Sequence, residues 1–366
     1  MINLKFFPSR QLAFYMVRLF VTRSLAVLIA LVLILMTLDL LGESGKILEV
    51  PGNGDAELWH YVALRIPLLV SRFLPFSVLL GALIAFVGLN QHSEVVAMKA
   101  AGLSAHQILA PLIVASIGIA AALFAFNETV VVKSARSVTA WSDNDYKPVP
   151  PESGILSNVW IRSGDDLIRA GHVAGSGAGF HAEKVIIYDR SSRVLEREIR
   201  ADHARPLPNG SWRLDNVRIY DAAMNVARRV PAIEAMQGVT PSQLTLSRVD
   251  PEELDYWTLQ DRIAELEAAG RPVDEARAGL AHKVSGPLST LLMPLLAAIA
   301  AFGLARSGQV LLRACVGMAL GFAYFVADNF SLAMGNAGAY PPLIAAWAPF
   351  LLFLLIGETV LVRTEE

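Results

Sequence analysis

The sequence contains little charge and almost no cysteine. Of its 366 residues 17% are charged, against about 25% in an average soluble protein. The single cysteine, Cys315, lies in an apolar run, which excludes an intramolecular disulfide and a zinc site built on cysteines. The net charge of −2 points to no partner by itself, but 54% hydrophobic residues and a mean hydropathy of +0.47 indicate a membrane protein.

Motifs that carry common enzyme chemistry are also absent. The chain has no P-loop, no Gly-x-Ser-x-Gly elbow and no His-Glu-x-x-His motif, so it cannot hydrolyse ATP by the P-loop route. The glycine-rich run Gly175–Gly179 lies between predicted strands with no helix after it, which favours a hairpin over a phosphate loop. His172, His181 and His203 lack ligand spacing and are expected to be scattered strand residues. We assign no catalytic residue, metal ligand or cofactor.

Six strongly apolar stretches are present, three before and three after one long polar block. Each is long enough to cross a hydrocarbon core of about 30 Å as a helix. The first has no small-residue cleavage site before polar sequence, so we expect a retained anchor rather than a signal peptide. We predict a first transmembrane half over 1–133 with spans at about 12–42, 60–89 and 106–130, and a second half over 283–366 with spans at about 283–305, 309–331 and 341–362.

Basic residues next to the spans predict the orientation, because they concentrate on the cytoplasmic side. With the N-terminus inside, Lys46 is the only basic residue in the short outside loops. Both termini are therefore predicted to be cytoplasmic and the polar block to lie outside. The inside would hold Lys5, Arg10, Arg18, Arg23, Lys99, Arg306, Arg313 and Arg363.

The polar block changes from helical to strand-like patterning. Short alternating or β-branched runs separated by turn residues predict an all-β domain over 134–250. A helical pattern returns at Trp257–Ala269, within a helical connector predicted over 251–282. The predicted strands are Val159–Ile161, Leu167–His172, Lys184–Asp189, Val194–Ile199, Trp212–Tyr220 and Asn225–Ile233.

The inside loop between the second and third spans predicts a short helix. Its serine can cap the N-terminus, its glutamate lies in the first turn, and its valine and methionine fall on one stripe before a terminating glycine. Ser104–Gln107 then has capping-box spacing for the next helix. The short helix is either a connector at the membrane surface or a contact for a cytoplasmic partner. Its residues are Ser93, Glu94, Val95, Met98 and Gly102.

Several runs of sequence resemble the lipopolysaccharide export permease family, the LptF/LptG proteins. They lie in both apolar halves, whereas the polar block resembles the family only in placement and strand content. The last two runs and the helix at 259–270 are more similar to LptG than to LptF. The runs are Ser93–Ser104, Pro75–Gly81, Asn127-Glu128, Gly321–Phe330 and Pro341–Pro349.

The resemblance implies a multi-pass subunit of the bacterial inner membrane with a periplasmic jellyroll-like domain. It implies a heterodimer with an LptF-type permease, driven by an LptB-type ATPase dimer that binds ATP and Mg, and an LptC-type partner. The complex would extract lipopolysaccharide and pass it to a periplasmic bridge. The helix Ser93–Gly102 would be the ATPase-coupling helix, with Glu94 as its charged contact.

Lipid phosphates need cations near the outer rim of an apolar cavity. Charges at membrane depth usually face a cavity or a partner, which favours Arg72, while Arg65 can instead extend to the headgroups. Asp39 matches an acid in LptG-type sequences, or is a solvated helix end. Lys133 and Arg136 are further candidates or ordinary rim charges.

Two departures and three alternatives accompany this interpretation. Met36 and Leu68 stand where comparable LptG sequences carry lysines. The chain could instead be the permease of another lipid or lipoprotein exporter, or a membrane-anchored envelope scaffold. A membrane-anchored enzyme would require a nucleophile and base that we cannot assemble.

Gly317–Gly321 is a Gly-x-x-x-Gly run that permits close helix packing.

Overall fold

The computed structural model divides the chain into two compact units. The helical unit comprises Met1–Gly45, Asp55–Ala135 and Pro251–Glu366, and the sheet unit comprises Lys46–Gly54 and Arg136–Asp250. The described residues are 8–148, 156–174, 179–191, 194–221, 226–245, 249–268, 271–302 and 310–363.

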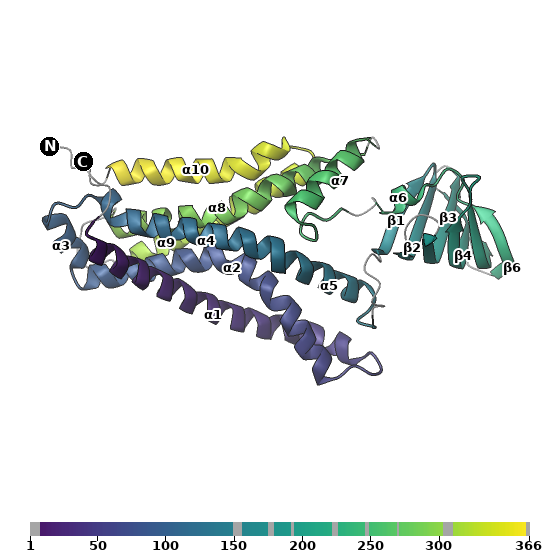
Figure 1. Cartoon of the computed structure of the whole chain (residues 1–366), viewed down its shortest axis with the longest axis horizontal. Helices are drawn as coiled ribbons and strands as arrows, with labels where there is room; N and C mark the ends of the chain where they lie inside the picture. The colour runs from purple at the N-terminus through teal and green to yellow at the C-terminus, as the bar shows by residue number, and fades with distance from the viewer. Residues whose placement is uncertain are drawn as a thin grey trace. The chain divides into compact units, whose positions relative to one another are not determined.

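Long apolar helices run along the helical unit (Figure 1). Five stretches within the described residues are long and apolar enough to cross a membrane: Arg10–Leu48, Asp55–Gln91, Ala105–Asp143, Cys315–Asn336 and Pro342–Arg363. The helices are α1 (Arg10–Leu48), α2 (Asp55–Gln91), α3 (Glu94–Ala100), α4 (Ala105–Phe126), η1 (Asn127–Val131), α5 (Val132–Asp143), α7 (Tyr256–Ala268), α8 (Asp274–Phe302), α9 (Val310–Asn336) and α10 (Pro342–Arg363).

The predicted span at about 283–305 falls on α8, which is not among those five stretches. Its first turns carry acidic residues and Lys283, and the predicted end of the span lies outside the described residues. The count of six spans therefore stays a prediction.

The α8 helix forms the centre of the helical core. It contacts α2, α4, α9 and α10, and its apolar side chains between Leu292 and Ala298 are almost fully buried. These side chains pack in one cluster with Phe86 of α2 and Tyr324 of α9. A continuous apolar core of this kind fixes the relative positions of the surrounding helices.

One face of α1 packs against the rest of the unit through every fourth residue. The buried stripe consists of Met16, Phe20, Ser24, Leu28, Val32 and Met36. Residues four apart lie on one helix face, so α1 presents a single narrow seam. At Gly81 of α2 a Cβ atom would lie only 2.5 Å from the Cα of Ser24, so the glycine permits this close approach.

The sheet unit contains one six-stranded sheet, and each of the six predicted strands is present. The block predicted to be all-β over 134–250 also contains helix, in α5 up to Asp143 and at Pro241–Thr245. All neighbours are antiparallel and follow sequence order. A jellyroll needs two facing sheets, and the described strands form one, so that detail is not confirmed. The strands are β1 (Leu156–Ser163), β2 (Asp166–Ala174), β3 (His181–Ser191), β4 (Val194–Pro206), β5 (Trp212–Asp221) and β6 (Val226–Ala235).

The core of the sheet unit covers one face of the sheet. Trp212 and Leu214 are fully buried, and the Trp212 Nε1 donates to the Val239 carbonyl at 2.7 Å. Leu244 of the short helix α6 (Pro241–Thr245) is buried in the same cluster. The opposite face of the sheet carries mostly charged and aromatic side chains, described below.

The connector helix is confirmed almost to the residue. The α7 helix extends from Tyr256 to Ala268 and buries Leu259, Ile263 and Leu266, the predicted stripe. Asp255 caps it, accepting from the Thr258 backbone N–H at 3.0 Å and from the Thr258 hydroxyl at 2.7 Å. These hydrogen bonds stabilise the carboxylate and lower the pKa of Asp255.

Candidate functional site

The short helix α3 lies at the same end of the helical unit as the start of α1 and the end of α10 (Figure 1). Val95 and Met98 are buried in the helical core, as their spacing predicted. The opposite face is exposed and carries Val96, which is 66% exposed, and Lys99. A helix anchored on one side with an exposed opposite side can contact a partner.

The C-terminal end of α3 agrees with its predicted termination. Gly102 has φ +87°, and its N–H donates to the Lys99 carbonyl at 2.9 Å while that of Leu103 donates to Met98 at 3.1 Å. This pair of bonds is the Schellman motif, which favours glycine. The next helix begins with the predicted capping box between Ser104 and Gln107.

The predicted capping hydrogen bond at the N-terminus of α3 is wrong. Ser93 occupies the predicted N-cap position, but it has φ 60° and its side chain makes no capping hydrogen bond. Only two residues separate Gln91 at the end of α2 from Glu94. This tight turn places Ser93 in the left-handed region, whereas a capping serine normally has an extended backbone.

Glu94 contacts α1, a partner that sequence reasoning missed. The Tyr15 hydroxyl donates to Glu94 Oε1 at 3.2 Å. The two residues lie 79 positions apart, so no local pattern could have indicated the pair. The hydrogen bond positions the carboxylate at the junction of α1 and α3.

Asp39 and Arg65, two predicted rim residues, bind each other. The Arg65 guanidinium donates to both carboxylate oxygens of Asp39, at 2.9 and 3.0 Å, and the buried Tyr61 donates its hydroxyl at 2.7 Å. A bidentate pair of this kind is stronger than a single hydrogen bond. The charge of Arg65 is therefore largely matched within the chain.

Arg72 is more accessible than Arg65. Its side chain is 68% exposed, and its nearest acid is Glu252, also exposed, at 3.7 Å. Exposed ion pairs at such distances contribute about 0–1 kcal/mol, so an incoming anion can displace this one. Lys133 and Arg136 are both exposed on α5. Met36 and Leu68, the two positions where lysines were expected, differ in burial. Met36 is buried in the α1 seam, and Leu68 is half-buried.

A largely buried ion pair joins η1 to α8, and sequence reasoning did not single out its lysine. Lys283 donates to Glu128 at 3.1 Å, and the two side chains are only 12% and 15% exposed. The Tyr256 backbone N–H also donates to Glu128. Beside it, Ser71 donates to Asn127 at 2.6 Å. Asn127 and Glu128 begin a π-helical turn, a feature frequent at functional sites.

Several helices of the helical unit carry exposed apolar side chains, among them α1, α9 and α10. On α1 these side chains include Leu25, Ile29, Leu33 and Leu38, and on α9 they are Val316, Met318, Phe322, Val326 and Phe330. Patches of this extent indicate contact with lipid or another subunit. Within the described residues, Gly321 of the Gly-x-x-x-Gly run packs against Leu79 of α2.

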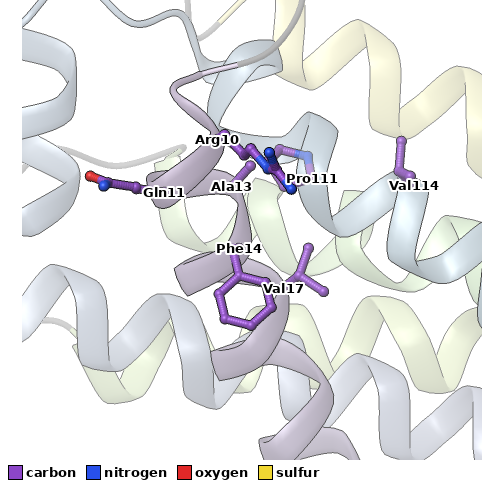
Figure 2. A pocket seen from close by; sticks show the side chains of 7 residues that line it. All are labelled: Arg10, Gln11, Ala13, Phe14, Val17, Pro111 and Val114. Carbon is purple, nitrogen blue, oxygen red and sulfur yellow. The ribbon is translucent and has the colours of Figure 1, made fainter.

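A cavity of about 520 Å³ lies between the first turns of α1 and α4. Figure 2 shows the residues that line it, which include Phe14, Val17 and Val114 and one charged residue, Arg10. Val17 and Asp39 are 22 positions apart on one helix, roughly 33 Å. The cavity is thus far from the predicted rim residues, and none of them lines it.

Two of the three histidines considered for a metal site lie in one row of the sheet. His172 and His203 pair on either side of Glu183, with His203 Nδ1 at 3.7 Å from its carboxylate. Burial, and then the nearby Lys184, lower the pKa of His172. No group of three metal-binding side chains is found among the described residues.

Comparison with known proteins matches nearly the whole chain. Residues 14–363 match the family described as lipopolysaccharide export system permease LptF/LptG. The permease protein LptG of Escherichia coli K12 is 24% identical over 312 residues, covering 83% of this chain and 84% of that protein. LptG of Haemophilus influenzae strain Rd is 24% identical over 326 residues, covering 86% and 89%. The chain belongs to the LptF/LptG family of lipopolysaccharide export system permeases, and its predicted similarity to LptG is confirmed.

Proposed function

We propose that this chain is the permease subunit of an ATP-driven exporter that extracts lipopolysaccharide from the bacterial inner membrane. The match of residues 14–363 to a permease family carries this proposal, because it includes both helical parts and the sheet. The chain would pair with an LptF-type permease, two LptB-type ATPase subunits and an LptC-type partner. ATP and Mg would bind to the ATPase and not to this chain.

The proposed topology has six spans, both termini in the cytoplasm and a jellyroll-like periplasmic domain. The start of α1 and the last turn of α3, which holds Lys99, carry basic residues, as cytoplasmic segments do. The helix α3 would then face the cytoplasm, where its exposed side and Glu94 would contact the ATPase. The exposed apolar faces of α1 and α9 would face the lipid and the partner permease.

Among the rim candidates, Arg72 is the one we favour for a lipid phosphate. It is mostly exposed and only weakly paired, whereas Arg65 is held by Asp39 through two hydrogen bonds. Lys133 and Arg136 would add positive charge along α5. The Arg65–Asp39 pair would then act mainly as a brace between α1 and α2.

Co-purification tests the proposed function as a whole. We expect the protein expressed in a Gram-negative host to retain a second permease, an ATPase and lipopolysaccharide after mild detergent extraction. Mass spectrometry of bound proteins and lipids would identify them. A different bound lipid with the same ATPase would indicate another lipid exporter. Protein partners without ATPase or lipid would favour a scaffold instead.

Reversing the charge of Arg72 tests the rim site. We expect Arg72→Glu to reduce photocrosslinking of lipopolysaccharide by about tenfold or more, because an acid facing a phosphate costs at least about 1.4 kcal/mol. Crosslinkers would be placed at positions on α2 next to residue 72. The matched control is Arg262→Glu, an exposed arginine of α7 that also has an acidic partner. Equal crosslinking in both variants would remove Arg72 from the site.

A further inference from the structure

A row of arginines crosses the sheet on the face opposite the hydrophobic core. The strand register places six residues in line, each directly opposite the next. The neighbours of Trp160 in β1, Val159 and Ile161, are buried in the core, so the row points the other way. From β1 to β6 the row consists of Trp160, Arg169, Ile186, Arg200, Arg218 and Arg229.

This arrangement is unfavourable for the sheet by itself. Like charges directly opposite each other on neighbouring strands destabilise a sheet, and Arg200, Arg218 and Arg229 occupy three neighbouring strands. Glu198 pairs with Arg200, and Asp202 pairs with Arg218 at 3.1 Å. Arg229 is exposed and has no acidic partner among the described residues. The row therefore keeps excess positive charge where packing alone would not place it.

Aromatic rings lie beside the guanidinium groups. Trp160 and Tyr188 are stacked with their planes 5° apart and their centroids at 5.9 Å. The guanidinium of Arg169 lies 5.7 Å from the Trp160 ring, and that of Arg200 lies 4.8 Å from the Tyr220 ring. Tyr188 and Tyr220 belong to the adjacent row, on either side of Glu198. Trp160 is 44% exposed, so a flat apolar surface is open to solvent.

The guanidinium groups and the aromatic rings together indicate the chemical class of the ligand. Arginine binds phosphate and carboxylate with two parallel hydrogen bonds, and it does so better than lysine. Exposed aromatic faces provide flat apolar surface for the C–H groups of a sugar ring. Strands are spaced by about 4.8 Å, so Arg169 and Arg229 are roughly 19 Å apart, which suits a ligand with several anionic groups.

We propose that this face binds an acidic oligosaccharide, meaning linked sugar rings that bear phosphate or carboxylate groups. The guanidinium group of Arg229 holds an anion, Arg218 lies directly opposite it and adds positive charge while it stays bound to Asp202, and Trp160 lies under a ring. If the ligand is the sugar part of the exported lipid, the inference rests on the proposed function. A free acidic glycan of the cell envelope has the same chemistry, and the experiment distinguishes the two.

The test measures binding of a soluble glycan to the full-length protein in detergent. The probe is deacylated lipopolysaccharide with its phosphates intact, titrated calorimetrically at low ionic strength. We expect the double variant Arg218→Gln/Arg229→Gln to bind at least about tenfold more weakly than the wild type. The control Arg262→Gln/Arg277→Gln removes the same charge from exposed, acid-paired arginines of the helical unit and should bind normally.

The remaining probes decide what is recognised. Equal affinity of the double variant and the control overturns the proposal, as does equal binding of a dephosphorylated, uncharged oligosaccharide. Tighter binding of poly-glutamate than of any glycan overturns it in favour of an acidic protein partner. Equal binding of a polyuronate supports the acidic-glycan site but removes its link to the exported lipid. Because calorimetry measures only the binding of a soluble probe, the result does not depend on ATP hydrolysis or on transport.

Discussion

Replacing Lys283 with methionine is expected to destabilise the helical unit by about 3 kcal/mol, since it leaves a largely buried carboxylate without its cation. Lys283 and Glu128 are 12% and 15% exposed and bind at 3.1 Å. Glu128 would keep the hydrogen bond from the Tyr256 backbone N–H, so we expect a loss at the low end of what a fully buried pair would cost. Thermal and denaturant unfolding in detergent micelles, monitored by the far-UV circular dichroism signal of the helices, would measure the change.

Two further variants separate charge from packing. The double variant Glu128→Gln/Lys283→Met removes both charges and is expected to recover most of the stability, because neutral replacements of buried ion pairs are often tolerated. Lys133→Met, at an exposed position of α5, should change stability by no more than about 0.5 kcal/mol. A single Lys283 variant as stable as this control would show that the pair is not a significant contact.

Reversing the charge of Glu94 is expected to uncouple the chain from its ATPase. Val95 and Met98 still anchor α3 in the Glu94→Arg variant, so the helix should stay in place while its charged contact is inverted. A like-charge contact at an interface costs several kcal/mol, and we expect at least about a tenfold loss of co-purifying ATPase. ATP-dependent release of lipopolysaccharide from proteoliposomes should fall in parallel.

Tyr15→Phe is the matched control for that experiment. It removes the 3.2 Å hydrogen bond to Glu94 but leaves the carboxylate charge in place. If Glu94 acts through the partner, this variant should retain most of the ATPase. If Tyr15→Phe is as defective as Glu94→Arg, the carboxylate matters for the α1–α3 contact instead. Wild-type association in Glu94→Arg would contradict the coupling assignment.

Features set by nearby residues could be predicted from the sequence. The strands of the sheet follow from alternation, and the buried face of α7 follows from the spacing of Leu259, Ile263 and Leu266. The end of α3 at Gly102 follows from the need for a positive φ. The Ser93 cap failed because the length of the turn, not the residue type, determined its backbone conformation.

Features set by distant residues could not be predicted. Arg65 lies 26 residues from Asp39, and Lys283 lies 155 residues from Glu128, so each pair exists only once the helices have packed. A single sequence contains the charges but not their pairing. The arginine row is a similar case, since a shift of β2, β4, β5 or β6 by one residue would move its arginine to the opposite face.

The contact between Ser24 and Gly81 also limits how α1 can move. The buried seam of α1 repeats every fourth residue, so sliding it along α2 by about one turn would place a similar seam on the same surface. Such a slide would bring Phe20 or Leu28 opposite Gly81, where only a small residue allows the two backbones so close. Gly81 therefore fixes the position of α1 along its own axis. If α1 moves during a functional cycle, we expect it to rotate or tilt about its contact with Gly81 and not to slide.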